Sequence, residues 1–266
     1  MVNNERISYN ETRGEKMLRL ENVKKTYVSK IGLNKYEALK GISFEVGDGE
    51  FVSIMGPSGS GKTTLLNMLG TIDTVSSGAI YIDNVDLTKM KKKELSDYRR
   101  EKIGFIFQDF NLLNTLTLKE NILLPIVLGE SKHKIDFKKL QEVTKKLGIS
   151  HILNKYPYEV SGGERQRTAC ARAIITNPKI ILADEPTGNL DSKSSQELLS
   201  MLELLNKEYN ITILMVTHDI FAASYSDRVL FIRDGKLYNE LIKEGPRKEF
   251  FDAIIDFEAT LGGGVE

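Results

Sequence analysis

The 266-residue sequence has little or none of several features that would place it in large classes of protein. Its one cysteine, Cys170, allows no internal disulfide of the kind on which small secreted domains depend. No apolar run reaches the roughly 18 residues that a membrane span needs, and the longest, ILLPIVL at 122–128, contains a proline. The N-terminus has no apolar signal segment. We therefore predict a cytoplasmic chain that reaches a membrane only through a partner.

An excess of charge of either sign is also absent. Lys+Arg and Asp+Glu both number 37, which gives a formal net charge of zero. This balance argues against bulk attraction to nucleic acid or to an anionic membrane, so we expect no nucleic-acid partner. What the chain does have is 41% hydrophobic residues, enough for a sizeable core in one large domain or two small ones.

Strand-like and helix-like segments alternate along the chain, which indicates an α/β fold with a mainly parallel sheet. Residues 1–16 are polar and aperiodic, so we predict a disordered leader there. The stretch from about 110 to 177 has mostly helical patterns and predicts a helical lobe inserted into the sheet domain. Strands are expected at 18–23, 41–46, 51–56, 79–84, 103–108, 179–184, 211–218 and 228–238, and helices after Gly61 and at 92–102, 118–128, 137–147, 162–176 and 192–209.

The segment GPSGSGKTT at 56–64 follows the apolar run FVSIM and opens a predicted helix. It matches the phosphate-binding pattern G-x-x-x-x-G-K-[ST], in which glycines let backbone N–H groups point at phosphate oxygens. In this pattern Lys62 reaches the β- and γ-phosphates, and the Thr63 hydroxyl ligates Mg²⁺. We predict that a nucleotide is bound by Gly56, Ser58, Gly59, Ser60, Gly61, Lys62, Thr63 and Thr64.

Two adjacent acids, Asp184 and Glu185, end the apolar run at 180–183. Burying a carboxylate there is costly unless a cation pairs with it. In nucleotide hydrolases with this phosphate loop the acid that closes the strand holds Mg²⁺, which is the role expected for Asp184. Glu185 is then expected to polarise the attacking water, the alternative being a helix-capping or surface acid. Two acids favour hydrolysis over binding alone.

A second glycine motif, VSGGERQR at 160–167, precedes another predicted helix. Free N–H groups and the positive end of the helix dipole make Ser161, Gly162 and Gly163 a candidate anion site. Because the first loop already holds one side of the phosphates, this site is expected to bind the same nucleotide from another subunit. Taken alone, the motif favours a simple helix N-cap.

Together these residues resemble the ATP-binding-cassette (ABC) family over roughly 17–241. The family's motifs occur in order: an aromatic loop near Tyr27, Walker A at 56–63, the Q-loop at Gln108, the signature at 161–165, Walker B at 180–185, the D-loop at 189–192 and the switch histidine His218. The resemblance implies a P-loop ABC domain with a mainly parallel core, an antiparallel β subdomain and a helical subdomain at about 110–177. A tail at 242–266 is expected to form a short amphipathic helix.

The resemblance also implies a head-to-tail homodimer that holds two ATP molecules between its copies. Each ATP would touch Lys62 and Thr63 of one copy and Ser161 and Gly163 of the other. The implied roles are catalytic base for Glu185, Mg²⁺ and water sensing for Gln108, γ-phosphate contact for His218, communication across the dimer for Asp191, and adenine stacking for Tyr27, with Tyr36 nearby as a rival.

The signature departs from the family's common LSGGQ, since it has Val160 and Glu164 in place of the leucine and the glutamine. Glu164 puts an acid near the nucleotide and is expected to slow turnover without abolishing it. His133 and His151 are expected at the surface, and Cys170 in packing.

Longer stretches resemble one branch of the family, that of lipoprotein-releasing, cell-division and macrolide-exporter ATPases. NTLTLKENILLPI and the tail FFDAIIDFEATLGGGVE are most similar to ATPases of bacitracin- and lantibiotic-resistance transporters. This resemblance implies a ten-span permease partner, a place on the inner face of the cell membrane, and a sensor histidine kinase reached through the permease. Phe110, Leu112, Leu113 and Leu116 are expected to divide between the core and a permease groove. A cell-division or lipoprotein-release ATPase and a soluble ABC ATPase acting on DNA or ribosomes remain alternatives.

Overall fold

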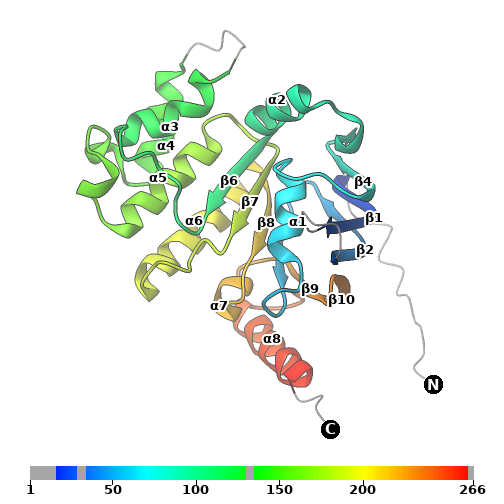
Figure 1. Cartoon of the computed structure of the whole chain (residues 1–266). Helices are drawn as coiled ribbons and strands as arrows, with labels where there is room; N and C mark the ends of the chain where they lie inside the picture. Colours follow the sequence, from blue (N-terminus) through cyan, green and yellow to red (C-terminus); the bar gives the residue numbers. More distant parts are fainter. Residues whose placement is uncertain (1–15, 29–33, 130–134, 263–266) are drawn as a thin grey trace, which may run out of the picture.

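The computed structural model describes residues 16–28, 34–129 and 135–262, arranged as two sheets with helices around them (Figure 1). A four-stranded antiparallel sheet has the order β2 (Lys35–Gly47), β1 (Lys16–Val28), β4 (Ser77–Ile82) and β5 (Val85–Asp86). A six-stranded sheet has the order β10 (Lys236–Ile242), β9 (Arg228–Arg233), β3 (Phe51–Met55), β8 (Thr212–Val216), β7 (Ile180–Asp184) and β6 (Ile103–Phe107). Its strands are parallel except β10, so the predicted mainly parallel core and antiparallel subdomain are confirmed.

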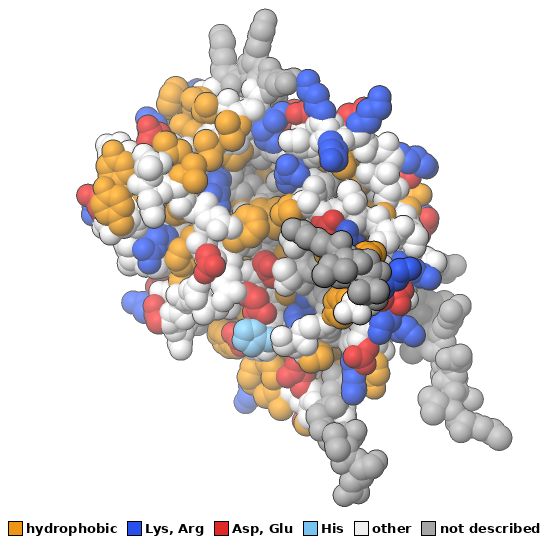
Figure 2. Space-filling view, in the orientation of Figure 1, with side chains coloured by type: hydrophobic (Ala, Val, Ile, Leu, Met, Phe, Trp, Pro, Cys, Tyr) orange, Lys and Arg blue, Asp and Glu red, His pale blue; other side chains and the backbone are white. Residues whose placement is uncertain are grey.

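Helices pack on both sides of the six-stranded sheet, and three of them form a lobe at one end of the molecule (Figure 1). That lobe consists of α3 (Leu118–Val127), α4 (Phe137–Lys146) and α5 (Gly162–Ile174), and hydrophobic side chains gather on its surface (Figure 2). The other helices are α1 (Lys62–Leu69), α2 (Lys92–Lys102), α6 (Ser192–Tyr209), α7 (Ile220–Ala223) and α8 (Arg247–Gly262). Within the described ranges no helix is long and apolar enough to cross a membrane.

Some of the segments and residues that were predicted from the sequence lie outside the described part of the chain. The leader expected at 1–16 lies outside it except for Lys16, which begins β1, and His133 lies outside it as well. The sequence reasoning missed β5 and α7, which have two and four residues and are too short for a periodic pattern to show.

Strand β7 explains why four apolar residues precede the two acids. Ile180 and Leu182 join the apolar cluster that lies between the two sheets and α1, whereas Ile181 and Ala183 join the cluster beneath the helical lobe and α6. All four are fully buried. A strand of a parallel sheet is covered on both faces, and a continuous apolar run follows from that.

Four parallel strands end at the same edge of the sheet. In the register of the sheet, Asp184 of β7 pairs with Phe107 of β6 and with Val216 of β8, and Val216 pairs with Ile54 of β3. The residues that directly follow these strands are therefore brought side by side. Clefts at the carboxyl ends of the strands are the usual ligand sites of such sheets.

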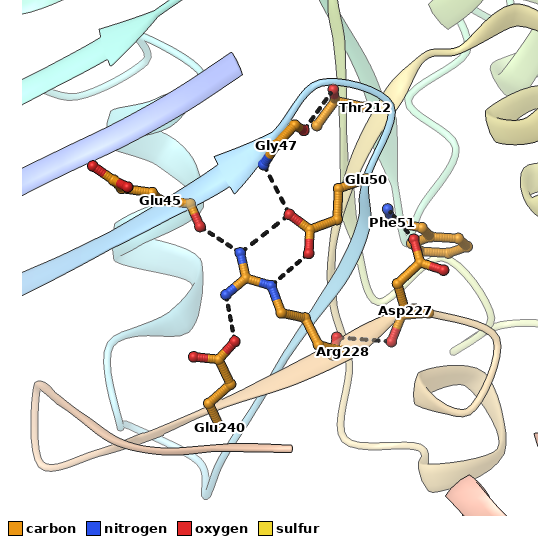
Figure 3. A network of polar contacts seen from close by, with 9 residues as sticks. Glu45, Gly47, Glu50, Phe51, Thr212, Asp227, Arg228 and Glu240 are labelled. Carbon is orange, nitrogen blue, oxygen red and sulfur yellow. Dashed lines mark hydrogen bonds and ion pairs between the residues drawn. The ribbon is translucent and has the colours of Figure 1, made fainter. Parts of the chain in front are cut away.

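A buried ion-pair network around Arg228 ties β9 to the turn between β2 and β3 (Figure 3). Arg228 Nε lies 2.7 Å from Glu50 Oε1, Nη1 lies 2.6 Å from Glu240 Oε1, and Nη2 donates to the carbonyl of Glu45. The Arg228 and Glu50 side chains are only 5% and 8% exposed. Burial lowers the pKa of Arg228, but the two carboxylates outweigh burial and raise it overall. The network fixes the start of the strand that leads into the phosphate loop.

We expect Arg228→Met to lower the free energy of unfolding by about 3–5 kcal/mol, because it leaves the Glu50 carboxylate buried without its cation. Urea unfolding measures the change. The exposed Lys236→Met on β10 serves as the control and should stay within about 0.5 kcal/mol of wild type. Adding Glu50→Gln to Arg228→Met should recover part of the loss, and no recovery would contradict this account of the network.

Candidate functional site

A cavity of about 800 Å³ opens at this edge of the sheet, over the turn between β3 and α1. It brings together residues from the phosphate loop, from the ends of β7 and β8, and from β2, β9, β10 and α8. The lining consists of Tyr36, Gly56, Pro57, Ser58, Gly59, Gly61, Lys62, Thr63, Thr64, Glu185, His218, Phe231, Ile232, Arg233, Tyr238 and Glu258. The loop at 56–64 thus meets Glu185 and His218 in one place.

The loop has the backbone that phosphate binding requires. Gly59 and Gly61 have φ of 78° and 104°, a left-handed region that glycine enters without a steric penalty. The helix α1 begins at Lys62, so its free N–H groups face the cavity. Lys62 Nζ donates to the carbonyls of Gly56 and Pro57 at 2.7 and 2.9 Å. Burial lowers the pKa of Lys62, whereas the carboxylates of Glu185 and Asp184 oppose that shift.

The carboxylate of Asp184 has the properties expected of a ligand for a divalent cation. Its Oδ1 atom is buried and has no hydrogen-bond partner in the protein. Burial and then the neighbouring Glu185 raise the pKa of the Asp184 carboxyl, and Lys62 opposes the rise. A buried anion with an unpartnered oxygen fits a hard cation such as Mg²⁺. In the described part of the chain no three His, Cys, Asp or Glu residues cluster, so the remaining ligands would be the Thr63 hydroxyl, phosphate oxygens and water.

Glu185 and His218 contact each other directly. His218 Nδ1 lies 2.9 Å from Glu185 Oε2, and the His218 side chain is 75% exposed. Glu185 has φ of 45°, which is uncommon for a residue other than glycine, and its N–H donates to the carbonyl of Val216. Such backbone strain occurs where the surrounding structure fixes a functional side chain. Glu185 is therefore held at the carboxyl edge of the sheet rather than at a helix cap.

Gln108 packs against the segment that follows Glu185. A Cβ atom added at Gly188 would lie 2.8 Å from Gln108 Nε2, and Asn189 Nδ2 donates to the carbonyl of Gln108 and to Asp109 Oδ1. The D-loop at 189–192 includes Asn189, but the motif did not predict its contact with Gln108, and Gly188 was not predicted as a site residue. Only the place of Gly188 next to the D-loop hints at a role, because the contacts join residues 80 positions apart.

We expect Gly188→Ala to lower the rate of ATP hydrolysis at least about tenfold, since the new methyl group displaces the Gln108 side chain and small misplacements are costly in catalysis. A steady-state phosphate-release assay measures the change. In a Gln108→Ala background the same substitution should have little further effect. If it lowers the rate equally in both backgrounds, Gly188 does not act through Gln108.

The signature residues lie outside this cavity. Ser161 is the N-cap of α5, and its N–H and hydroxyl both donate to Glu164 Oε2 at 2.8 Å. These bonds lower the pKa of Glu164 and form a capping box, so Ser161 caps the helix, as the motif taken alone indicates. Since none of 160–165 lines the cavity over the phosphate loop, the two motifs do not meet within one chain. Asp191 likewise caps α6, accepting from the N–H groups of Lys193 and Ser194.

Tyr36, but not Tyr27, lines the cavity. Tyr36 Oη donates to the carbonyl of Gly59 at 3.3 Å, whereas Tyr27 Oη donates to Asp73 Oδ2 at 2.8 Å. His151 is exposed, with Nε2 4.0 Å from Glu164 Oε1. Cys170 is fully buried, and burial raises the pKa of its thiol to about 12, which fits packing and not reactivity.

Comparison with known proteins agrees with this geometry. Residues 39–188, more than half of the chain, match the family model described as ABC transporter. The chain belongs to the ABC transporter family. It is 52% identical over 248 residues to "Bacitracin export ATP-binding protein BceA" of Halalkalibacterium halodurans, and the matched region covers 93% of this chain and 97% of that protein. It is 49% identical over 249 residues to "ABC transporter ATP-binding protein YxdL" of Bacillus subtilis, covering 94% and 96%.

A solved structure supports the same assignment. The dimeric ATP-binding cassette MJ0796 bound to ADP and Pi superposes with a TM-score of 0.78 at 42% identity, covering 86% of this chain and all of that one. The organism of that protein is Methanocaldococcus jannaschii. This ABC protein is therefore an ATPase subunit, and the structural relative is a nucleotide-bound dimer.

Proposed function

We propose that the chain hydrolyses ATP to drive a bacterial membrane permease that protects the cell against antimicrobial peptides of the bacitracin and lantibiotic type. The observation that carries this proposal is the 52% identity to the bacitracin-export relative over almost the full length of both chains. The rival function is a cell-division or lipoprotein-release ATPase of the same branch, which the motifs of this chain also fit.

In this proposal, residues of the cavity and of the neighbouring strand ends share the steps of hydrolysis. The loop N–H groups and Lys62 bind the phosphates of ATP, and Glu185 accepts a proton from the attacking water. His218 holds the γ-phosphate once its imidazole leaves Glu185, and Gln108 orients the water from the neighbouring strand end. Thr63, Asp184 and Gln108 hold Mg²⁺, which when bound would neutralise charge that develops on the phosphates.

The signature of a second copy completes each site. Ser161, Gly162 and Gly163 open α5, and they do not line the cavity over the phosphate loop of their own chain. In the dimer the Ser161 hydroxyl turns from the Glu164 carboxylate toward the γ-phosphate. Because that carboxylate holds the hydroxyl through a charge-assisted bond and is itself an anion, Glu164 opposes closure and slows turnover.

The permease is proposed to dock in a cavity of about 490 Å³ between α2, β6, α3 and α5. Its lining includes Phe105, Phe107, Asn111 and Pro125 together with Arg99 and Arg172, so it fits an amphipathic helix that carries acidic residues. The apolar residues expected in the groove, Phe110, Leu112, Leu113 and Leu116, do not line it, and Leu112 packs on the core. Arg172 donates to the carbonyls of Phe110 and Asn111, which links the groove to the segment after Gln108.

Isolation of the complex tests the proposal. Tagged Glu185→Gln is expressed in its native cell, trapped with MgATP, extracted in mild detergent and analysed by mass spectrometry. We expect a ten-span permease with a large external domain at the inner face of the membrane, accompanied by a sensor histidine kinase. A four-span partner would move the assignment to cell division, and recovery of ribosomes or DNA-bound proteins would overturn the transport function.

A further inference from the structure

Helix α8 reaches the nucleotide cavity and forms part of its wall. Glu258 of α8 lines the cavity together with His218 and Glu185. The preceding residue, Phe257, packs on Phe231 and Tyr238, with ring centroids 4.4 and 6.4 Å apart, and both of those rings line the same cavity. Glu258 is thus held at the cavity wall by aromatic packing.

The rest of α8 braces the segments on either side of the site. Phe250 and Ile254 are buried in one cluster with Met55, the last residue before the phosphate loop, and with Ala223 of α7. The Arg247 guanidinium lies over the ring of Tyr225 at 4.2 Å. Because α7 begins two residues after His218, α8 packs directly on the chain that carries this histidine. A shift of α8 would therefore also move the segment that positions the His218 imidazole.

Two carboxylates, those of Glu185 and Glu258, line the same cavity as His218. Glu185 Oε2 lies 2.9 Å from its Nδ1 atom. Burial raises the pKa of Glu258 above its ordinary value, and His218 partly opposes that rise. The imidazole can pair with only one of the two acids through a given nitrogen.

We propose that Glu258 is a positioning residue that draws the imidazole of His218 away from Glu185, so that Glu185 is free to face the attacking water. The inference rests on the proposed roles of Glu185 and His218 and adds a residue from α8 to them. The structure shows His218 paired with Glu185. Without Glu258, we expect this pair to persist when nucleotide binds and to block the base. Glu258 also places a negative charge at the rim of an anion site, which weakens nucleotide binding slightly.

Steady-state ATPase kinetics of Glu258→Gln, which keeps the shape of the side chain, test the proposal. We expect kcat to fall about three- to tenfold while KM for MgATP stays unchanged or falls, since orientation is lost and binding is not. The exposed Asp252→Asn on the same helix should match wild type in both constants. The temperature of thermal unfolding should not change for either variant, which separates positioning from a structural role.

A double-mutant cycle with His218→Ala decides whether Glu258 acts through the histidine. The Glu258 substitution should have no further effect once the imidazole is gone. This inference alone would be overturned if Glu258→Gln had the wild-type kcat while His218→Ala had a lowered kcat. It would also be overturned if Glu258→Gln lowered kcat equally in the wild-type and His218→Ala backgrounds. Wild-type activity of His218→Ala would instead overturn the proposed role of His218 and, with it, this inference.

Discussion

Glu185→Gln is expected to lower the rate of ATP hydrolysis at least about a hundredfold, because a positioned general base contributes roughly 10²–10⁴ to the rate. The amide keeps the size of the side chain and its hydrogen-bond reach but cannot accept the proton of the attacking water. Binding of ATP should be retained or improved, since one negative charge beside the phosphates is removed. Phosphate release measures hydrolysis, and equilibrium binding of a fluorescent ATP analogue measures affinity.

The control for this variant is Glu142→Gln, which makes the same chemical change on the exposed surface of α4. It should hydrolyse ATP at the wild-type rate. Glu185→Gln with wild-type turnover would show that another group activates the water, and Asp184 would be the first acid to examine next.

Lys62→Ala is expected to raise the dissociation constant for MgATP at least about tenfold, because a charge-assisted hydrogen bond to an anion contributes roughly 1.5–3 kcal/mol. The ε-amino group lies in the cavity and already donates to two loop carbonyls, so it is preorganised close to the phosphates. Isothermal titration calorimetry measures the affinity.

The exposed Lys145→Ala on α4 removes a positive charge far from the cavity lining and should bind MgATP as wild type does. Equal affinities for Lys62→Ala and Lys145→Ala would mean that the loop at 56–64 does not carry the phosphate contacts. Hydrolysis by Lys62→Ala should be lost along with binding, so both assays are informative.

The features that sequence reasoning predicted well are those encoded in short stretches. The continuous apolar run at 180–183 predicts a doubly covered strand, and β7 is one. The glycine pattern at 56–61 predicts a loop with left-handed glycines, and Gly59 and Gly61 have that backbone. Strand ends that carry Gln108, Asp184 and His218 meet because parallel strands share an edge, which follows from the alternation of strands and helices.

Contacts between distant segments could not be predicted from local patterns. The Arg228–Glu50 pair joins residues 178 positions apart, and neither residue lies in a motif. The tail was predicted to be an amphipathic helix, but nothing in its sequence placed Glu258 in the cavity that His218 lines. By contrast, the capping box of Ser161 and Glu164 was visible in the sequence, because the S-x-x-E spacing is its signature.

We propose that two copies of this chain close around ATP, with Lys62 of one copy and Ser161 of the other on the same nucleotide. Light scattering coupled to size-exclusion chromatography of Glu185→Gln measures whether this dimer forms. With MgATP we predict twice the 30.0 kDa mass of one chain, and a return to the single-chain mass when nucleotide is removed or when Lys62→Ala is added. A protein that keeps the mass of one chain at saturating MgATP would contradict the account.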